Sequence, residues 1–193
     1  MTRIDTNAAL IIVDVQQGLD EHAYYGGQRN NPDAETNIAR LLQAWRATKR
    51  PVIHIKHNST NPRSPLRPGQ AGNAIKPEVA PEGAEPVLEK TVNSAFIGTD
   101  LEQRLRDAGI AQVVIVGLTT NHCVSSTVRM AGNFGFETIL IADATAAFDR
   151  TGVDGTSHPA QLVHDITLAS LNGEFATVLN TQDILENLAI GTP

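Results

Sequence analysis

Residues 112–123, Gln-Val-Val-Ile-Val-Gly-Leu-Thr-Thr-Asn-His-Cys, are the stretch that indicates the fold class. The first half, Gln112–Gly117, is a nearly unbroken apolar run, which is typical of a strand covered on both faces in a parallel sheet. Apolar residues at helical spacing follow from Val124. A strand that leads through a short turn into a helix is the repeating unit of α/β proteins.

The same alternation of strand and helix runs along the whole chain. Six β-branched runs predict strands at Ala9–Val15, Pro51–Lys56, Pro86–Glu89, Gln112–Gly117, Glu137–Ala142 and Phe175–Leu179. Five helices are predicted around Ile38 to Trp45, Leu101 to Ala108, Val124 to Met130, Leu162 to Ala169 and Ile184 to Leu188. No linker or internal repeat divides the 193 residues. We therefore predict one α/β domain, residues 1–193, with a doubly wound parallel sheet of six strands and helices on both faces.

Composition excludes several classes of protein. The 15 Lys and Arg residues against 21 Asp and Glu residues give a net charge of -6, which argues against nucleic acid or an anionic membrane as partner. The single cysteine, Cys123, excludes an intrachain disulfide. The apolar stretch Ala8 to Val13 is too short for a signal-peptide core, and none approaches a membrane span. We expect a cytoplasmic protein that binds a small molecule.

Three predicted strands deliver reactive side chains to the same edge of the sheet. Asp14 follows the first strand, Lys90 the third and Cys123 the fourth. Ligands bind at the carboxyl ends of the strands in open α/β sheets, so these residues are expected to meet there. Alone, each has an ordinary interpretation: Cys123 as a small buried residue, Asp14 as a turn residue and Lys90 as an exposed charge. Their convergence favours a nucleophile, a general base and a cation at one site.

The chemistry of that set is nucleophilic catalysis. A thiol in the first turn of a helix, near an ammonium group, has a lowered pKa, and the thiolate is the nucleophile. Lys90 can supply the ammonium and Asp14 can accept and return protons. Thr119, Thr120 or Asn121 is expected to cap the helix that carries Cys123. The N–H groups of that first turn would face an oxyanion.

Spaced motifs resemble those of the isochorismatase-like cysteine hydrolases over nearly the whole chain. The motifs are Ile12-Val13-Asp14-Val15-Gln16, then Glu89-Lys90 ahead of Asn93-Ser94-Ala95-Phe96, then Val116 to Val124. The resemblance implies strand order 3-2-1-4-5-6 and a catalytic triad of Asp14, Lys90 and Cys123. It further implies a cis peptide between Leu118 and Thr119, an oxyanion hole formed by the N–H groups of Thr119 and Cys123, and a homodimer or homotetramer.

The resemblance leaves the reaction open between two chemistries. Amidohydrolases of this family form a thioester on the cysteine, whereas isochorismatases protonate a vinyl ether from the aspartate. Cys123 favours cleavage of a C–N bond in a small amide, ureido or carbamoyl compound. Vinyl ether hydrolysis stays an alternative, as does a binding or regulatory protein with a silent pocket. A redox sensor lacks support because the chain has no resolving cysteine.

No metal and no other cofactor are expected. Nicotinamidases of the family hold a metal with an aspartate and several histidines, but the loop with Asp20 and His22 departs from their spacing. His54 and His57 are three apart on an extended segment, so they tend to face opposite ways. Both are interpreted as packing or loop residues.

Candidate substrate-binding residues come from the motifs and from two early loops, the irregular stretches Gly18–Asn31 and Asn58–Pro81. Gln16, Asn93 and Phe96 lie where the family lines its pocket. The loop residues Tyr24, Tyr25 and Arg67 can contact either the substrate or a second subunit. Arg63, Arg67 and Lys76 could receive an acidic substrate group, although a solvated loop is favoured.

Overall fold

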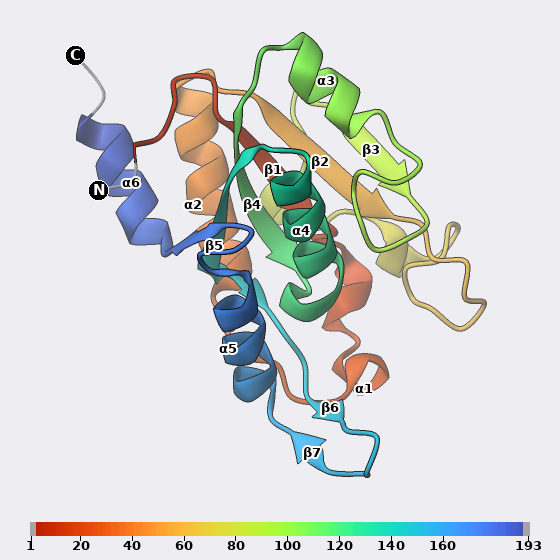
Figure 1. Ribbon diagram of the computed structural model, residues 1–193. Coiled ribbons are helices and arrows are strands. Elements are labelled where there is room, and N and C mark those ends of the chain that lie inside the picture. Colours follow the sequence, from red (N-terminus) through yellow and green to blue (C-terminus); the bar gives the residue numbers. More distant parts are fainter. Residues whose placement is uncertain (1–2, 191–193) are drawn as a thin grey trace.

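A six-stranded parallel sheet forms the centre of the structure (Figure 1). In the computed structural model, which describes residues 3–190, the strand order is β3-β2-β1-β4-β5-β8. The strands are β1 (Ala9–Val13), β2 (Val52–His57), β3 (Val87–Lys90), β4 (Gln112–Leu118), β5 (Glu137–Ala146) and β8 (Thr177–Leu179). This confirms the predicted α/β class and the order 3-2-1-4-5-6, since β8 is the sixth strand of the sheet along the chain.

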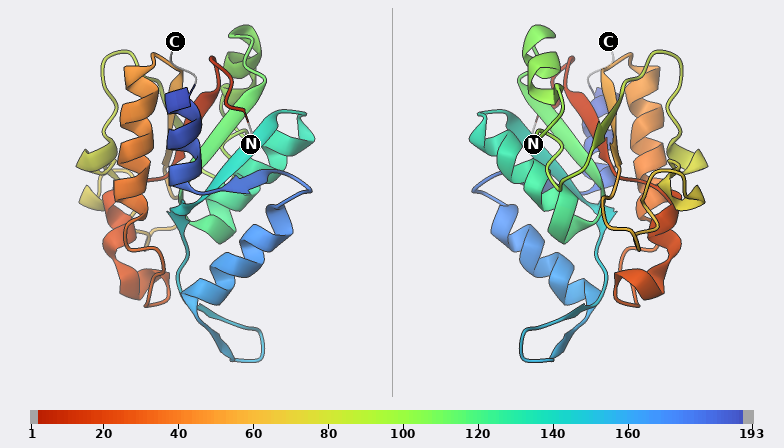
Figure 2. Two further views of the ribbon diagram at one scale, coloured as in Figure 1. Left: turned by 90° about the vertical axis from the view of Figure 1, so that its left-hand side faces the viewer. Right: turned by 90° about the vertical axis from the view of Figure 1, so that its right-hand side faces the viewer.

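Helices cover both faces of the sheet, as Figure 2 shows edge-on. On one face lie α2 (Ala34–Ala47) and α6 (Thr181–Ile190), and on the other lie α3 (Leu101–Asp107), α4 (Ser125–Asn133) and α5 (Ala160–Leu171). The side chains of β1 alternate between the two layers: Ile11 packs toward α3 and α4, and Leu10 toward α2. Every residue of β1 and β4 is buried, which explains their continuous apolar sequence.

Short helical turns occupy the two early loops near the carboxyl ends of the strands. They are the 3₁₀ turn η1 (Gln17–Asp20), α1 (His22–Tyr25), η2 (Ala71–Asn73) and η3 (Pro77–Val79). A π-helical turn, η4 (Thr120–Val124), connects β4 to α4.

The structure adds elements that hydrophobic periodicity does not indicate. The fifth strand is predicted to end at Ala142, but β5 continues to Ala146 past a register shift against β4. The chain then forms a hairpin of β6 (Arg150–Thr151) and β7 (Ser157–His158), and strands of two residues are too short to show a pattern.

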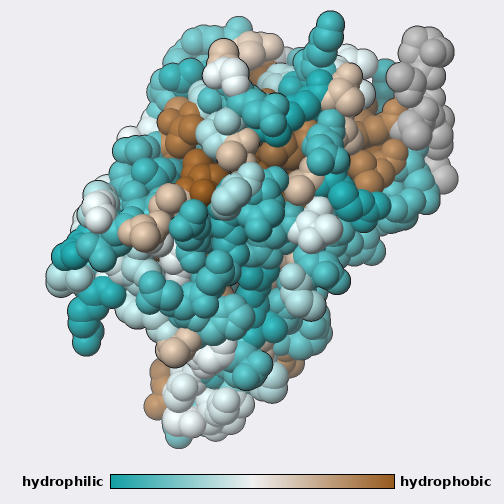
Figure 3. All heavy atoms as spheres, turned by 180° about the vertical axis from the view of Figure 1, so that it is seen from behind, coloured by the Kyte–Doolittle hydropathy of each residue, from teal (hydrophilic) through white to brown (hydrophobic). Residues whose placement is uncertain are grey.

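The surface is mostly hydrophilic, with apolar exceptions. Seen from behind, apolar side chains gather mainly in the upper half of the molecule (Figure 3). On α5, Leu162 and Ile166 are 43% and 58% exposed, so part of the apolar spacing that predicts this helix lies outside the core. Among the described residues, no helix has both the length and the apolar character required to cross a bilayer.

Candidate active site

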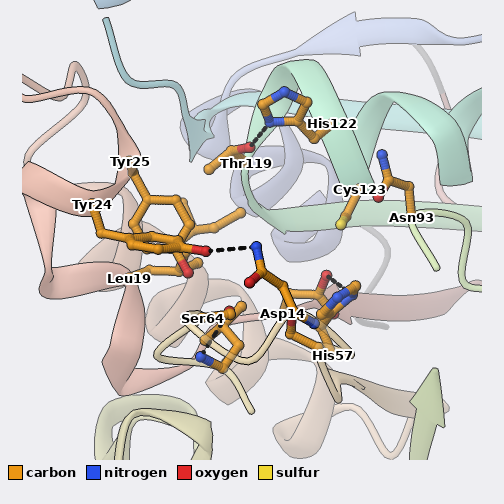
Figure 4. Close-up of a pocket in the computed structure, with 14 residues that line it drawn as sticks. Asp14, Leu19, Tyr24, Tyr25, His57, Ser64, Asn93, Thr119, His122 and Cys123 are labelled. Atoms are coloured by element: carbon orange, nitrogen blue, oxygen red, sulfur yellow. Dashed lines mark hydrogen bonds and ion pairs between the residues drawn. The ribbon is translucent and has the colours of Figure 1, made fainter. Parts of the chain in front are cut away.

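A cavity of about 230 Å³ opens at the carboxyl ends of β1, β2 and β4. Asp14, His57 and Cys123 line it from the sheet side, and Tyr24 and Tyr25 line it from α1 (Figure 4). Three leucines and several small polar side chains complete the wall. The cavity lies where β1 and β4 are neighbours and the strand order reverses, the usual ligand site of this architecture.

Asp14 and Lys90 form a buried ion pair at the floor of the cavity. Lys90 Nζ lies 2.6 Å from Asp14 Oδ2, and the two residues are only 2% and 1% exposed. Asp14 has a φ of 54°, a left-handed conformation that aspartate tolerates better than most residues. Its other oxygen, Oδ1, is buried and has no protein partner within the described part of the chain. One carboxylate oxygen is therefore held by Lys90 and the other is free to exchange a proton.

Cys123 approaches this pair from the π-helical turn η4. Its sulfur, one oxygen of Asp14 and one nitrogen of His57 all lie within 4.8 Å of one another. Just upstream, the peptide bond between Leu118 and Thr119 is cis. Thr127 Oγ1 donates a hydrogen bond of 2.7 Å to the Cys123 carbonyl oxygen and holds the turn against α4.

The expected side-chain cap is absent from this turn. Thr119 precedes η4 without a capping hydrogen bond. Its hydroxyl pairs instead with His122 Nδ1 at 3.1 Å, and the Thr120 hydroxyl pairs with His164 Nδ1 at 2.9 Å. The hydroxyls thus anchor the two histidines and leave the start of the turn uncapped.

Burial governs the protonation states of the site. It raises the pKa of Cys123, with the Asp14 carboxylate raising it further, and Lys90 offsets only part of the increase. The expected lowering of the thiol pKa is therefore not found, because burial outweighs the charge of Lys90. Burial also raises the pKa of Asp14 despite the attraction of Lys90. A raised pKa favours the protonated thiol, which lies beside the Asp14–Lys90 pair.

His57 is the site residue that sequence reasoning missed. Its Nδ1 lies 3.0 Å from Lys90 Nζ, and burial followed by the charge of Lys90 lowers its pKa, which keeps the ring neutral. The packing interpretation holds for His54, which is buried and bonds Glu85 at 2.9 Å. It is wrong for His57. Its position in the sequence could have indicated a site residue, because His57 ends the second strand at the same edge of the sheet as Asp14 and Lys90.

The oxygen, nitrogen and sulfur donors of Asp14, His57 and Cys123 are a set that suits zinc. However, the Lys90 ammonium lies against two of the three donors, at 2.6 Å and 3.0 Å. A second cation would face that charge at close range, so the residues do not fit a metal ion while Lys90 is protonated.

The structure separates the candidate substrate-binding residues into two groups. Tyr24 and Asn93 line the cavity, as does Tyr25. Phe96 does not, because it packs in the core against Phe134 and Phe136. Gln16 does not line it either.

Gln16 is fully buried and its amide is occupied within the protein. Its Oε1 accepts a 2.8 Å hydrogen bond from the backbone N–H of His57, and its Nε2 donates to the carbonyl oxygens of His57 and Asn73. Gln16 therefore fastens β1 to the end of β2 rather than facing a substrate.

The basic loop residues also lie outside the cavity wall. Lys76 binds Asp20 at 2.5 Å and Glu35 at 2.7 Å in a separate charged cluster. Neither Arg63 nor Arg67 is among the cavity-lining residues of the described chain. Arg63 and Arg67 are exposed, as expected for a solvated loop. The same expectation is wrong for Lys76, which is buried and already paired with two carboxylates, so it is not open to an acidic substrate group.

Comparison with known proteins finds one family. The model of the isochorismatase domain matches residues 8–183. YrdC of Bacillus subtilis, an uncharacterized isochorismatase family protein, is 48% identical over 184 residues, covering 95% of this chain and 97% of that protein. The streptothricin hydrolase of Streptomyces noursei is 32% identical over 152 residues, covering 77% of this chain and 58% of its own length.

A solved structure agrees closely with this fold. A protein of Chromobacterium violaceum, assigned as a hydrolase of the isochorismatase family, superposes with a TM-score of 0.93 at 45% identity. The match covers 98% of this chain and 97% of that one.

Proposed function

Because the chain belongs to the isochorismatase family of hydrolases, we propose that it is a cysteine hydrolase of small, uncharged amide, ureido or carbamoyl compounds. The observation that carries the proposal is the position of Cys123 beside the buried Asp14–Lys90 pair in one cavity. A nucleophile, a proton acceptor and a fixed cation are the groups that acyl transfer needs.

The first half of the reaction forms a thioester. Cys123 Sγ attacks the substrate carbonyl carbon while its proton passes to Asp14, whose Oδ1 is free of protein partners in the described structure. The N–H groups of Thr119 and Cys123 are proposed to stabilise the resulting oxyanion. Asp14 then returns the proton to the leaving nitrogen, the C–N bond breaks, and ammonia or an amine departs.

The second half releases the acid. Asp14, again a carboxylate, takes a proton from water, and the hydroxide attacks the thioester carbon. The C–S bond breaks and the proton held by Asp14 returns to Cys123. Lys90 keeps its charge throughout, so the buried site is never left with an unbalanced anion.

The charge of the cavity wall supports an uncharged substrate. No lysine or arginine is among the described residues that line the cavity, and Lys90 is engaged by Asp14 and His57 behind it. Burial and then Arg150 lower the pKa of His122, so this ring is also neutral. A substrate carboxylate would lose water without gaining a counter-ion.

The alternative vinyl ether hydrolysis needs only a protonating acid. It gives no role to a thiol placed against that acid, and the cysteine is therefore the group that separates the two proposals. A silent binding protein would also keep the cavity but has no use for a buried ion pair at its floor.

The decisive experiment is ammonia release from a panel of amides, ureas and carbamoyl compounds, followed by Cys123→Ser and Asp14→Asn on the best substrate. We expect each variant to lose at least about a thousandfold in kcat. Near wild-type turnover by either variant would overturn the triad, and activity of Cys123→Ser on a vinyl ether would favour the alternative.

A further inference from the structure

His57 and Lys90 occupy paired positions on neighbouring parallel strands. The register of β2 against β3 places His57 opposite Lys90, so their side chains project from the same face of the sheet. Lys90 Nζ lies 3.0 Å from His57 Nδ1 and 2.6 Å from Asp14 Oδ2. The ammonium therefore sits between a neutral ring and a carboxylate.

The backbone of His57 is held on both sides. Gln16 Oε1 accepts its N–H at 2.8 Å, while its carbonyl oxygen accepts from Gln16 Nε2 at 3.1 Å and from Asn73 Nδ2 at 3.2 Å. These three bonds fix the position from which the imidazole reaches Lys90.

The contact determines which ring nitrogen carries the proton. An ammonium group can only donate, so Nδ1 must be the acceptor and the neutral ring carries its hydrogen on Nε2. The Lys90 side chain is fully buried and carries three N–H groups. Two of them are directed by Asp14 and His57, and the third is left for the Cys123 sulfur, whose pKa Lys90 lowers.

From this geometry we infer that His57 is a positioning residue, which orients the Lys90 ammonium toward the sulfur of Cys123 by accepting one of its hydrogens. The inference rests on the proposed cysteine chemistry and adds a fourth side chain to it. Neutrality is the essential property. A carboxylate in its place would cancel the charge of Lys90 and leave the thiolate unsupported, whereas a side chain without an acceptor would let the ammonium turn wholly to Asp14.

The test uses the rate at which iodoacetamide alkylates the thiol, measured from pH 6 to 10 with thermal melting in parallel. Cys123 is the only cysteine, so the reagent reports this site alone and needs no identified substrate. The titrating groups that face the sulfur are Asp14, Lys90 and His57 from the strand ends, His122 beside it, and Tyr25 across the cavity.

Three substitutions separate positioning from simple packing. His57→Asn keeps a neutral acceptor near the place of Nδ1 and should alkylate within about threefold of wild type. His57→Leu removes the acceptor and His57→Asp adds a charge, so both should be at least about tenfold slower at pH 8 and should stay slower than wild type up to pH 10. His158→Asn, in the hairpin away from the cavity, is the matched control and should match wild type.

Two outcomes would overturn the inference. If folded His57→Leu alkylates at the wild-type rate across the pH range, the ring only packs. If His57→Asn is as slow as His57→Asp, the imidazole acts as more than a neutral acceptor. If His57→Leu does not fold, the alkylation rates of His57→Asn and His57→Asp alone test the inference. A Cys123→Ser variant that still hydrolyses amides would refute the proposed function without altering these alkylation results.

Discussion

Gly117 and Val13 lie opposite each other on β4 and β1, so close that a Cβ at Gly117 would be 2.0 Å from the Val13 carbonyl oxygen. Gly117 also has a φ of +123°, which side-chain-bearing residues rarely adopt. This approach brings the end of β4, and with it Cys123, next to Asp14 at the end of β1. The geometry of the proposed catalytic site thus depends on a glycine that has no role in the proposed chemistry.

The variant Gly117→Ala should destabilise the protein by about 3 kcal/mol or more, because the clash is with backbone that cannot rotate away. Thermal or urea unfolding measures the loss. Gly135→Ala is the control: its φ is +80°, but a Cβ there meets no atom within 4 Å, so only about 1 kcal/mol of backbone strain is expected. Equal losses in the two variants would refute the importance of the close approach.

Breaking the buried ion pair should be costly for stability as well as for activity. Lys90→Met leaves the Asp14 carboxylate buried without its partner, and roughly 3–5 kcal/mol of unfolding free energy should be lost. Adding Asp14→Asn should recover much of the stability and none of the activity. Lys56→Met removes an exposed contact of 3.4 Å to Glu89 and should change stability by less than about 1 kcal/mol. A double variant no more stable than Lys90→Met would contradict the pairing.

Alkylation of the free protein should be slow at neutral pH. The pKa of Cys123 is raised by burial and by Asp14, so the rate should still be rising above pH 8.5. Asp14→Asn removes a negative charge beside the sulfur, which lowers the thiol pKa and should accelerate alkylation at pH 8. A wild-type rate that levels off below pH 7 would show that Lys90 outweighs burial.

Acid should unfold the protein partly through Glu35. Burial alone would raise the pKa of Glu35, but the hydrogen bonds from Arg29 and Lys76 outweigh it and lower the pKa to about 2. A lowered pKa contributes stability that is present above about pH 4.5 and is lost as the pH falls toward 2. In Glu35→Gln, unfolding free energy should therefore depend less on pH in this window. Glu102→Gln, on the exposed face of α3, should leave the pH dependence unchanged.

The protein should discriminate strongly between charged and uncharged substrates. Between two amides of similar size, the one that bears a carboxylate should have a kcat/KM at least about tenfold lower, because the cavity wall offers no cation. Paired kinetics at constant ionic strength measure this ratio. Equal values would point to a counter-ion recruited from outside the described cavity.

Much of the fold follows from local sequence pattern. The apolar runs of β1 and β4 and the helical spacing of Ile38, Leu41 and Trp45 arise because strands and helices bury side chains with different periods. Pattern alone does not predict everything: the strands of the β6–β7 hairpin are too short to show a hydrophobic period. The apolar residues of α5 have the spacing of a buried helix face, although some of them are exposed.

The sequence by itself determined the α/β class, the strand positions and the arrival of Asp14, Lys90 and Cys123 at one edge, since parallel strands end at the same side of a sheet. Only the tertiary structure decided that His57 joins them, that Gln16 supports His57 instead of a substrate, and that the thiol pKa is raised. These three features depend on the register between strands and on burial, and both are set by contacts with residues distant in the chain. No local pattern of residues encodes them.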